Sequence, residues 1–563
     1  MNHRLSVFSS IGIAMMLIAS LVCQAQPQAP ITRHVREAVR SGRAQSVGQV
    51  PASQSMRLEI VLPLRHQPEL ENFLQELYDP SSPVYRRFLT VEEFTARFGP
   101  SQEDYDTVIG FAKANGFAVA STSRNRVNVG VTGSVASIEK AFHLTMRIYQ
   151  HPTESRPFFA PDREPTANLP FPLWRIAGLD NYSIPRPLLQ HKNFQVQPDA
   201  TTGSGPDASF LGSDMRAAYY GGTTLIGSGQ SLGLLEYVGT DLADLNTYYQ
   251  NVGQTRSVPI TLLSTDGTST SCLASQGCDD TEQTLDMTQA LGMAPGLSSL
   301  VMYVGSSDAA ILNAMATAQP LNAQLSSSWV WGPPADPSTD DPYFEEFAAQ
   351  GQNLFQAAGD WGDWTQTLLA EGAIYPSDDV YITSVGGTDL NTASAGGAWS
   401  SETVWSDSGG GISTDNFAIP SWQVAMAAGC AECSVSYRNG PDVSANANFT
   451  FYVCADQSGC TANYWGGTSF AAPMWAGYMA LVNQQAIANG HPLLGFINPS
   501  LYAIGASSSY NSDFHDITSG NNGYPATTGY DLTTGWGSPN GSGLIDALAP
   551  RARYRGPHIG HSR

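Results

Sequence analysis

The chain has 563 residues, and 42% of them are hydrophobic, so it can bury a sizeable core and form more than one domain. Its formal net charge is −22, and only eight of its 27 Lys and Arg residues lie after residue 191. No Lys or Arg occurs between Arg256 and Arg438. This argues against nucleic acid as a partner, because phosphate binding requires basic groups. An acidic surface suits a protein that works in acid, and equally one adapted to high salt.

Residues 1–25 are typical of a signal peptide. Arg4 supplies a positive start, an apolar stretch follows from Val7 to Val22, and Cys23-Gln24-Ala25 ends in a small residue suited to cleavage. A permanent membrane anchor is the alternative, but the stretch is short for one. We therefore expect a secreted, extracellular protein with no membrane contact after signal cleavage. No later segment is apolar enough to span a bilayer.

A polar leader at 26–50 and a small α+β domain with an antiparallel sheet at 51–187 are predicted next. Strand-like alternation and helical periodicity follow one another along this part of the chain. Strands are predicted over 56–64 and 126–131, and helices over 68–78, 102–115 and 135–142.

From about residue 211 the pattern changes to short apolar runs that alternate with helices, which is typical of a parallel sheet buried on both faces. These runs are 231–237, 299–304, 321–329, 353–358 and 380–385. They predict an α/β domain over 211–550, with functional groups at the carboxyl ends of its strands. The polar residues 188–210 are interpreted as a linker with a cleavage region, and 551–563 as a basic tail.

Six cysteines remain after the signal peptide and form three close pairs. They are Cys272, Cys278, Cys430, Cys433, Cys454 and Cys460. In an exported protein this spacing predicts local structural disulfides, although the sequence leaves the pairing open. Cys430-Ala-Glu-Cys433 could instead be a redox motif or half of a zinc site, but no matching second element accompanies it.

Ser469 carries the clearest chemical signal, within Gly466-Gly467-Thr468-Ser469-Phe470-Ala471-Ala472-Pro473. The glycines allow a sharp turn, and the hydroxyl is expected at a helix N-terminus, with Pro473 in the first turn. A nucleophilic serine needs a base, normally histidine. Only four histidines follow residue 191, and none has a His-Gly-Thr context: His491, His515, His558 and His561. The sequence therefore indicates a base other than histidine.

Carboxyl groups are the candidate bases. Glu282 and Asp286 are four residues apart, on one face of a predicted helix, where repulsion and burial would raise one pKa. Asp360 follows an apolar strand and could, when protonated, donate to an oxyanion. Considered singly, the pair could be an ordinary acidic helix face and Asp360 a loop or N-cap residue.

Together these features resemble the sedolisins, or serine-carboxyl peptidases, and especially their kumamolisin-type members, from about residue 55 to residue 547. The matching segments are Gly467–Pro473, Glu282 with Asp286, Gly359-Asp360, Glu236, Ser328-Trp329, Gly409–Gly411 and Arg438–Ser444. The family's usual Gly-Asp-Ser-Gly reads Gly-Asp-Trp-Gly here, with Trp361 in place of serine. The resemblance implies a subtilisin-like parallel sheet flanked by helices. It also implies Ser469 as nucleophile, Glu282 as base, Asp286 as its partner and Asp360 as the oxyanion acid.

One structural Ca²⁺ is implied by the same resemblance, in the segment from Phe514 to Asp531. Calcium takes hard oxygen ligands. Asp516 and Asp531 would provide carboxylates, and Ile517, Thr527 and Gly529 would provide carbonyls. Without the resemblance, this Gly/Asn/Asp-rich stretch would be read only as a turn.

The N-terminal region resembles the family's activation domain, notably from Phe88 to Pro100. We therefore expect an acid-acting endopeptidase made as a zymogen, with protein or peptide substrates and its own prodomain as inhibitor. Because the prodomain is mildly basic, acid is expected to loosen its docking by neutralising carboxylates. Two alternatives are a non-catalytic exported binding protein on the same fold and a Ser-His-Asp subtilase.

Overall fold

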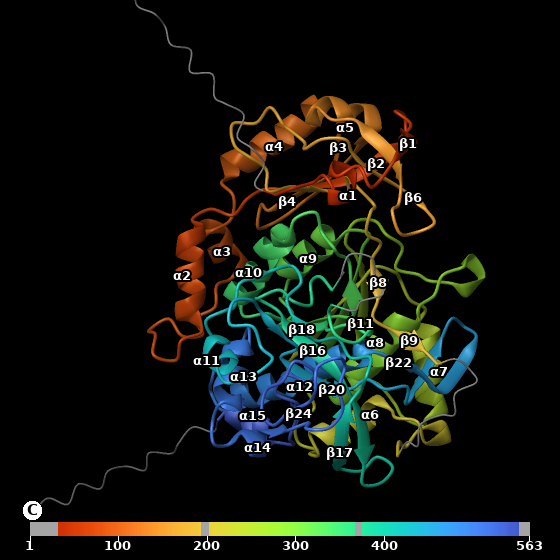
Figure 1. Cartoon of the computed structure of the whole chain (residues 1–563), viewed down its shortest axis with the longest axis vertical. Coiled ribbons are helices and arrows are strands. Elements are labelled where there is room, and N and C mark those ends of the chain that lie inside the picture. Colours follow the sequence, from red (N-terminus) through yellow and green to blue (C-terminus); the bar gives the residue numbers. More distant parts are fainter. Residues whose placement is uncertain (1–31, 193–201, 366–373, 551–563) are drawn as a thin grey trace, which may run out of the picture.

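An antiparallel α+β domain lies against a larger α/β domain in the computed structural model (Figure 1). Residues 32–192, 202–365 and 374–550 are described. The predicted signal peptide and basic tail lie outside these residues. In the described ranges, no helix combines the length and apolar character needed to cross a membrane.

The N-terminal domain is built on a four-stranded antiparallel sheet in the order β3-β4-β2-β7 and a three-stranded one in the order β1-β5-β6. Its strands are β1 (Ser46–Gln49), β2 (Ser55–Val61), β3 (Ala118–Thr122), β4 (Asn128–Ser134), β5 (Met146–Gln150), β6 (Pro157–Pro161) and β7 (Arg175–Ala177). Its helices are α1 (Glu37–Arg40), α2 (Gln67–Leu77), α3 (Val91–Arg97), α4 (Gln102–Ala114) and α5 (Val135–Phe142). The predicted antiparallel α+β domain is thus confirmed.

Residues 26–50, predicted to be a polar leader, are in part folded with this domain. From residue 46 to residue 49 the chain forms β1, which pairs with β5 in an antiparallel ladder. Ala38 is buried in a small cluster with Tyr149 and Phe158. The sequence prediction missed this contribution because β1 is exposed along its whole length and carries no apolar alternation.

The second domain contains a sheet in the order β11-β12-β10-β13-β15-β16-β17, with β20 also paired to β16. Neighbouring strands are parallel except for β17, which is antiparallel to β16. The strands are β10 (Ser231–Glu236), β11 (Ile260–Ser264), β12 (Ser299–Val304), β13 (Gln324–Ser327), β15 (Asn353–Ala357), β16 (Thr383–Thr392), β17 (Trp399–Val404) and β20 (Val443–Asn446). The five apolar runs found in the sequence correspond to β10, β12, β13, β15 and the start of β16.

Helices and smaller ladders surround this sheet. The helices are α6 (Gly212–Tyr219), α7 (Leu242–Asn251), α8 (Thr281–Met293), α9 (Asp308–Ala316), α10 (Asp341–Gln350), α11 (Val424–Ala427), α12 (Thr468–Ala488), α13 (Asn498–Gly505), α14 (Tyr510–Asp513) and α15 (Gly543–Leu548). The short strands are β8 (Arg186–Pro187), β9 (Gln190–His191), β14 (Trp329–Val330), β18 (Gly411–Ile412), β19 (Asn439–Gly440), β21 (Phe451–Ala455), β22 (Gly459–Gly466), β23 (Phe514–His515) and β24 (Ser538–Pro539).

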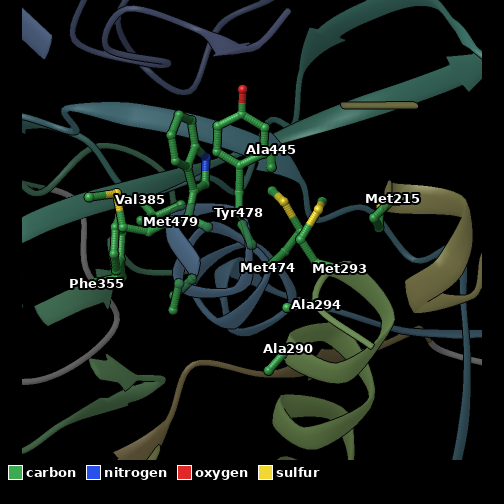
Figure 2. Close-up of a cluster of buried hydrophobic side chains, with 14 of the residues drawn as sticks. Met215, Ala290, Met293, Ala294, Phe355, Val385, Ala445, Met474, Tyr478 and Met479 are labelled. Carbon is green, nitrogen blue, oxygen red and sulfur yellow. The ribbon is translucent and has the colours of Figure 1, made fainter. Parts of the chain in front are cut away.

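The packing of α12 against α8 positions the candidate site. Both helices are almost wholly buried, and Met474 of α12 lies beside Met293 of α8 (Figure 2). The two backbones approach closely at Gly477, because a Cβ there would stand 2.9 Å from the carbonyl oxygen of Ala290. Glycine is the residue that permits this approach.

Pro473 lies deeper in α12 than expected. The helix begins at Thr468, so Pro473 is its sixth residue and not part of the first turn. A proline has no N–H and leaves the carbonyl four residues earlier without its helical donor. That carbonyl belongs to Ser469, and its oxygen lies 3.4 Å from the hydroxyl oxygen of Ser328.

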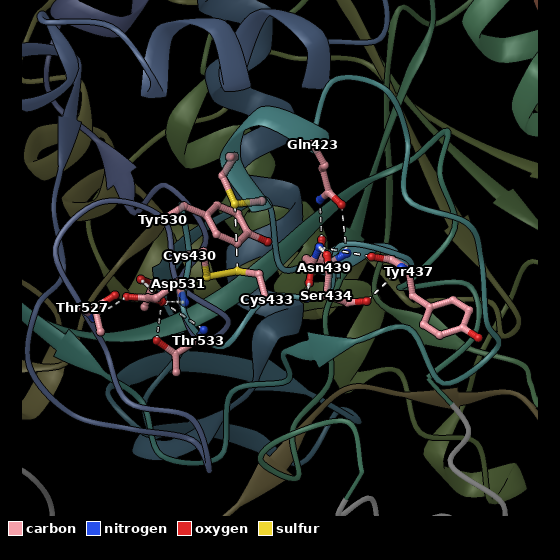
Figure 3. The surroundings of a disulfide bond; sticks show 12 residues. Gln423, Cys430, Cys433, Ser434, Tyr437, Asn439, Thr527, Tyr530, Asp531 and Thr533 are labelled. Atoms are coloured by element: carbon pink, nitrogen blue, oxygen red, sulfur yellow. Dashed lines mark hydrogen bonds between the residues drawn. A yellow bond between two sulfur atoms is a disulfide. The ribbon is translucent and has the colours of Figure 1, made fainter. Parts of the chain in front are cut away.

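The six cysteines form three local disulfides, as predicted. The pairs are Cys272–Cys278, Cys430–Cys433 and Cys454–Cys460. Figure 3 shows Cys430–Cys433 in the same neighbourhood as Tyr530 and Asp531. Because the two sulfurs are bonded to each other, this pair is not half of a zinc site.

The two domains share an extensive apolar and charged interface. Side chains of α2 and α3, including Phe73 and Phe94, form one hydrophobic cluster with Ala348 and Ala349 of α10. Arg175 of the N-terminal domain bridges two carboxylates of the α/β domain, Asp308 at 2.6 Å and Asp340 at 2.7 Å. These ion pairs agree with the complementary charges of the two halves of the sequence.

Candidate active site

Ser469 occupies the second position of α12 and is fully buried. Its backbone N–H is one of the first N–H groups of a helix, which have no partner within the helix itself. Gly467, which directly precedes the helix, has a φ of 153°, a conformation that favours glycine. The hydroxyl of Ser469 donates a hydrogen bond to the carbonyl oxygen of Leu188 and lies 3.5 Å from the carbonyl oxygen of Ser328.

Glu282 and Asp286 lie on α8, which packs against α12, and they are 3% and 0% exposed. This burial excludes the alternative of an ordinary solvated acidic face. Asp286 Oδ1 accepts a hydrogen bond of 2.8 Å from Ser328, and the Asp286 carboxyl group also lies within hydrogen-bonding reach of Glu236 and Glu282. Glu282 in turn lies within hydrogen-bonding reach of the Ser469 hydroxyl.

A third carboxyl group, Glu236 at the end of β10, extends this cluster. Its Oε2 accepts hydrogen bonds from Gln283 at 3.0 Å and from the indole N–H of Trp329 at 3.1 Å. Burial, together with repulsion from Asp286, raises the pKa of Glu236 well above its ordinary value. Glu236 and Ser328, both matched to family positions in the sequence, thus contact residues of the candidate site directly.

Asp360 follows β15 and is also fully buried. Its Oδ1 accepts two hydrogen bonds from Thr468, at 2.7 Å from the backbone N–H and at 2.8 Å from the hydroxyl. Its Oδ2 has no hydrogen-bond partner among the described residues. Thr468 therefore fixes one oxygen of Asp360 and leaves the other free beside the start of α12.

Burial raises the pKa of each of these carboxyl groups. For Glu282 the negative charge of Asp286 adds to the increase, and the adjacent Ser469 hydroxyl partly offsets it. Burial raises the pKa of Asp286 to about 8, although Ser328 opposes the shift by hydrogen bonding. The pKa of Asp360 also lies well above its ordinary value because of burial. Burial thus favours the protonated forms of these carboxyl groups beside the serine.

No histidine contacts the Ser469 hydroxyl in the described part of the chain. His491 lies 2.9 Å from the carbonyl oxygen of Pro550, and His515 stacks on Trp399 with a centroid separation of 3.9 Å. His558 and His561 fall outside the described residues.

Residues 186–192, which the sequence assigned to the prodomain end and the linker, pass directly over Ser469. The carbonyl oxygen of Leu188 accepts from the Ser469 hydroxyl and, at 3.3 Å, from its N–H. The side-chain amide of Gln190 donates to the carbonyl oxygen of Asp360. The sequence of this stretch contains no motif that predicts the contact. Which of its residues faces Ser469 depends on how the whole N-terminal domain docks.

The residues predicted to hold calcium form one loop cluster. Asp516 accepts hydrogen bonds from the N–H of Gly529 and from the hydroxyl of Tyr510, the latter at 3.0 Å. Asp531 accepts from the N–H of Thr527 at 2.9 Å, and Figure 3 shows this contact. Burial raises the pKa of both carboxyl groups, and neither has an ion-pair partner in the described chain. Two acidic side chains thus converge on the backbone of residues 527–529 without a neutralising cation.

Comparison with known proteins agrees with the combination of a subtilisin-like sheet and a separate N-terminal domain. Residues 43–194 match the family described as "Pro-kumamolisin, activation domain". Over 547 residues the chain is 31% identical to kumamolisin of Bacillus sp. (strain MN-32), covering 91% of this chain and 95% of that protein. It is 28% identical to xanthomonalisin of Xanthomonas sp. (strain T-22), covering 88% of this chain and 65% of that protein.

A solved structure gives the same result. The structure described as Pseudomonas sedolisin, a serine-carboxyl proteinase, complexed with two molecules of pseudo-iodotyrostatin aligns with a TM-score of 0.51 and 25% identity. The alignment covers 62% of this chain and 98% of that chain. Fold and relatives together define a peptidase made with an activation domain. The chain belongs to the sedolisin family of serine-carboxyl peptidases.

Proposed function

We propose that this protein is a secreted, acid-acting serine-carboxyl endopeptidase made as a zymogen. One observation carries the proposal: Ser469 of α12, the Glu282–Asp286 pair of α8 and Asp360 after β15 are all buried together, and no described histidine contacts the Ser469 hydroxyl. A serine among buried carboxyl groups suits peptide-bond hydrolysis with a carboxylate as the base.

In the proposed reaction Ser469 Oγ attacks the substrate carbonyl carbon, and Glu282 accepts the proton that the hydroxyl loses. Glu282 then returns this proton to the leaving amine. Asp286 lies on the same face of α8 and shares protons with Glu282, because two buried carboxylates cannot both be charged at little cost. Ser328 holds Asp286 in place through its hydrogen bond of 2.8 Å.

Asp360 is proposed to stabilise the oxyanion. Since Oδ1 already accepts two hydrogen bonds from Thr468, the proton is best placed on Oδ2, which has no other described partner. A protonated Oδ2 and the N–H of Ser469 would then donate to the developing negative charge. The positive end of the α12 dipole acts in the same direction.

Acid action follows from the protonation states that these roles need. Asp360 must carry a proton, and the Glu282–Asp286 pair must keep one negative charge. In the zymogen, residues 186–192 cover the site, and burial raises the pKa values of all three groups. Removal of this segment admits water and lowers these values towards the ordinary carboxyl range of about 4, so the working range is acidic.

Endopeptidase action is favoured over removal of short N-terminal peptides. The chain that crosses Ser469 continues in both directions, with Arg186 and Pro187 paired to β14 on one side and Gln190 and His191 paired to β22 on the other. A cleft that holds an uninterrupted chain accepts internal peptide bonds. The same covering segment supports the role of the prodomain as inhibitor.

One structural Ca²⁺ is proposed in the loop cluster that ends at Asp531. Asp516 and Asp531 would supply carboxylates, and Ile517, Thr527 and Gly529 would supply carbonyl oxygens. The residues fit such an ion, because buried Asp531 and half-buried Asp516 converge there without a described cation to neutralise them. The ion would cross-link this loop and takes no part in the chemistry.

The signal-like residues 1–25 and the three disulfides support secretion. The domain limits 51–187, 188–210 and 211–550 stay predictions. The binding-protein alternative would be favoured if a site residue had been lost, and all four are present.

The test is the rate of protein digestion from about pH 2.5 to pH 8 for the unaltered enzyme, for Glu282→Gln and for the exposed control Glu432→Gln. We expect an acid optimum and a loss of at least about 100-fold for Glu282→Gln, the usual contribution of a general base. Glu432→Gln should match the unaltered enzyme. A neutral optimum that survives Glu282→Gln would indicate a histidine base, and inactivity after proven prodomain removal would favour a binding protein.

A further inference from the structure

The segment from Arg186 to Lys192 is held in the site as an extended strand on both sides of Ser469. Before Leu188, Arg186 and Pro187 pair antiparallel with Val330 and Trp329. The N–H of Leu188 donates to the carbonyl oxygen of Ser328 at 2.8 Å. Strand addition of this kind fixes the register of a bound peptide through its backbone.

The ladder resumes on the other side of Leu188. Gln190 and His191 pair antiparallel with Gly466 and Trp465 of β22. The N–H of Lys192 donates to the carbonyl oxygen of Tyr464 at 3.0 Å. Two separate ladders therefore leave one short unpaired stretch, and this stretch contains the bond between Leu188 and Leu189.

That bond lies between the nucleophile and Asp360. A Cβ built on Gly467 would stand 2.4 Å from the carbonyl oxygen of Leu188, 2.6 Å from Asp360 Oδ2 and 3.1 Å from Leu189 Cα. One small space is thus bordered by Leu188 O, Asp360 Oδ2 and Leu189 Cα. The hydroxyl and N–H of Ser469 face the same carbonyl oxygen.

Side-chain burial distinguishes Leu188 from its neighbours. Leu188 is 0% exposed and belongs to the largest hydrophobic cluster of the α/β domain, whereas Leu189 is only partly buried at its edge. On the amino side, Arg186 is partly accessible, at 42% side-chain exposure, and pairs with Glu154 of the prodomain. The α/β domain therefore recognises Leu188 by its apolar side chain, and the residues before it mainly by their backbone.

We infer that the zymogen first cleaves its own Leu188–Leu189 bond, and that the mature enzyme selects a leucine-like aliphatic residue on the amino side of the cleaved bond. This inference rests on the proposed function. A bond forms between Ser469 Oγ and the carbonyl carbon of Leu188, and the hydroxyl proton passes to Glu282. The bond from that carbon to Leu189 N then breaks, and Leu189 leaves as an amine that takes the proton. Water hydrolyses the ester and leaves Leu188 as a carboxylic acid and Ser469 as an alcohol.

The first experiment acidifies the purified zymogen and measures the intact masses of the earliest products. We expect a propeptide that ends at Leu188, a mature chain that begins at Leu189, and a first-order rate constant that does not change with zymogen concentration. Ser469→Ala should yield neither product. If protein digestion depends on Ser469 but the earliest cut lies elsewhere, the inference is wrong and the proposed function stands. If no digestion depends on Ser469, both are wrong.

The second experiment tests the choice of leucine. Leu188→Ala removes three carbons from an apolar site, so self-cleavage should slow by at least about 100-fold. The matched control is Ile184→Ala, whose side chain is 46% exposed and should not affect the rate.

A third measurement avoids any folding defect of the Leu188 variant, because it uses the unaltered mature enzyme. Its substrates are a blocked hexapeptide with the sequence of residues 186–191 and the same peptide with alanine in the third position. We expect cleavage between the two leucines and at least about 100-fold lower kcat/KM for the alanine peptide. Equal kcat/KM for both peptides, or cleavage at another bond, would overturn the inference.

Discussion

Asp360 offers the sharpest test of the proposed chemistry, because its two oxygens have different surroundings. Oδ1 accepts two hydrogen bonds from Thr468, and Oδ2 faces the site without a described partner. In Asp360→Asn the amide oxygen can keep both contacts with Thr468, and the amide nitrogen can donate at every pH. In Asp360→Ala the donor is lost.

The expected magnitudes follow from these contacts. Removal of one oxyanion donor typically costs about 2.7–4 kcal/mol, so Asp360→Ala should lower kcat by about 10²–10³-fold at acid pH, where Asp360 of the unaltered enzyme is protonated. Asp360→Asn should keep most of the activity in acid. Because an amide does not ionise, its activity should also persist at higher pH, where an aspartic acid would lose its proton.

A nearby aspartate provides a control with the opposite sign. The negative charge of Asp407 contributes to the raised pKa of Asp360. Asp407→Asn removes this charge, so Asp360 should ionise at a lower pH. The alkaline limb of the pH–activity profile should therefore move to lower pH. Asp360→Asn should move the same limb to higher pH.

The assay is kcat and kcat/KM for a fluorogenic peptide across the pH range, after confirmed removal of the prodomain. A loss in Asp360→Asn as large as that in Asp360→Ala, at every pH, would refute the role of a protonated Asp360. An unchanged alkaline limb in Asp360→Asn would also refute it.

Three further predictions concern stability. Calcium chelation should lower the Tm of the mature enzyme by several degrees, because a bound ion stabilises only the folded state, and Asp516→Ala should abolish this response. Arg175→Met should lower the Tm of the uncleavable Ser469→Ala zymogen, since breaking a buried ion pair costs about 3–5 kcal/mol; an unchanged Tm would show that the pair contributes nothing. Burial raises the pKa of Glu346, beside Asn125 of the prodomain, from 4.5 to about 8. The protonated Glu346 side chain should therefore contribute fully to the stability of the zymogen below about pH 4.5, and this contribution should be lost as the pH rises through 8. The contribution is at most about 5 kcal/mol in the free energy of unfolding. In Glu346→Gln the Tm of the zymogen should fall less as the pH rises. The same pH dependence of Tm with and without the substitution would contradict this prediction.

The Glu346 prediction bears on how the prodomain is released. The sequence suggested that acid loosens docking by neutralising carboxylates, and the pairing of Arg175 with Asp308 and Asp340 provides contacts of that kind. Glu346, which accepts a hydrogen bond of 2.7 Å from Asn125, acts in the opposite direction. Acidification therefore weakens the ion pairs of the domain interface and at the same time stabilises the contact of Glu346. We therefore expect cleavage of the covering segment, rather than acidification alone, to make activation irreversible.

The sequence by itself determined the parts of the site that depend on near neighbours. The glycines before Ser469, the spacing of Glu282 and Asp286, and the apolar strand before Asp360 are all local patterns, and α12, α8 and β15 formed where these patterns predicted. Alternating apolar residues likewise predicted the antiparallel sheet, and continuous apolar runs predicted the parallel sheet. Such patterns are informative because they reflect backbone preferences and burial within a single element.

Only the tertiary structure decided how these elements meet. Close packing at Gly477 brings α12 against α8 and so brings Ser469 to the carboxyl groups. Ser328, which holds Asp286, comes from a third part of the chain. The placement of Leu188 over Ser469 depends on the docked N-terminal domain, including β1, whose exposed residues carry no apolar signal. Burial and pKa depend on what covers a group, and the covering residues come from distant parts of the chain, which no local sequence pattern specifies.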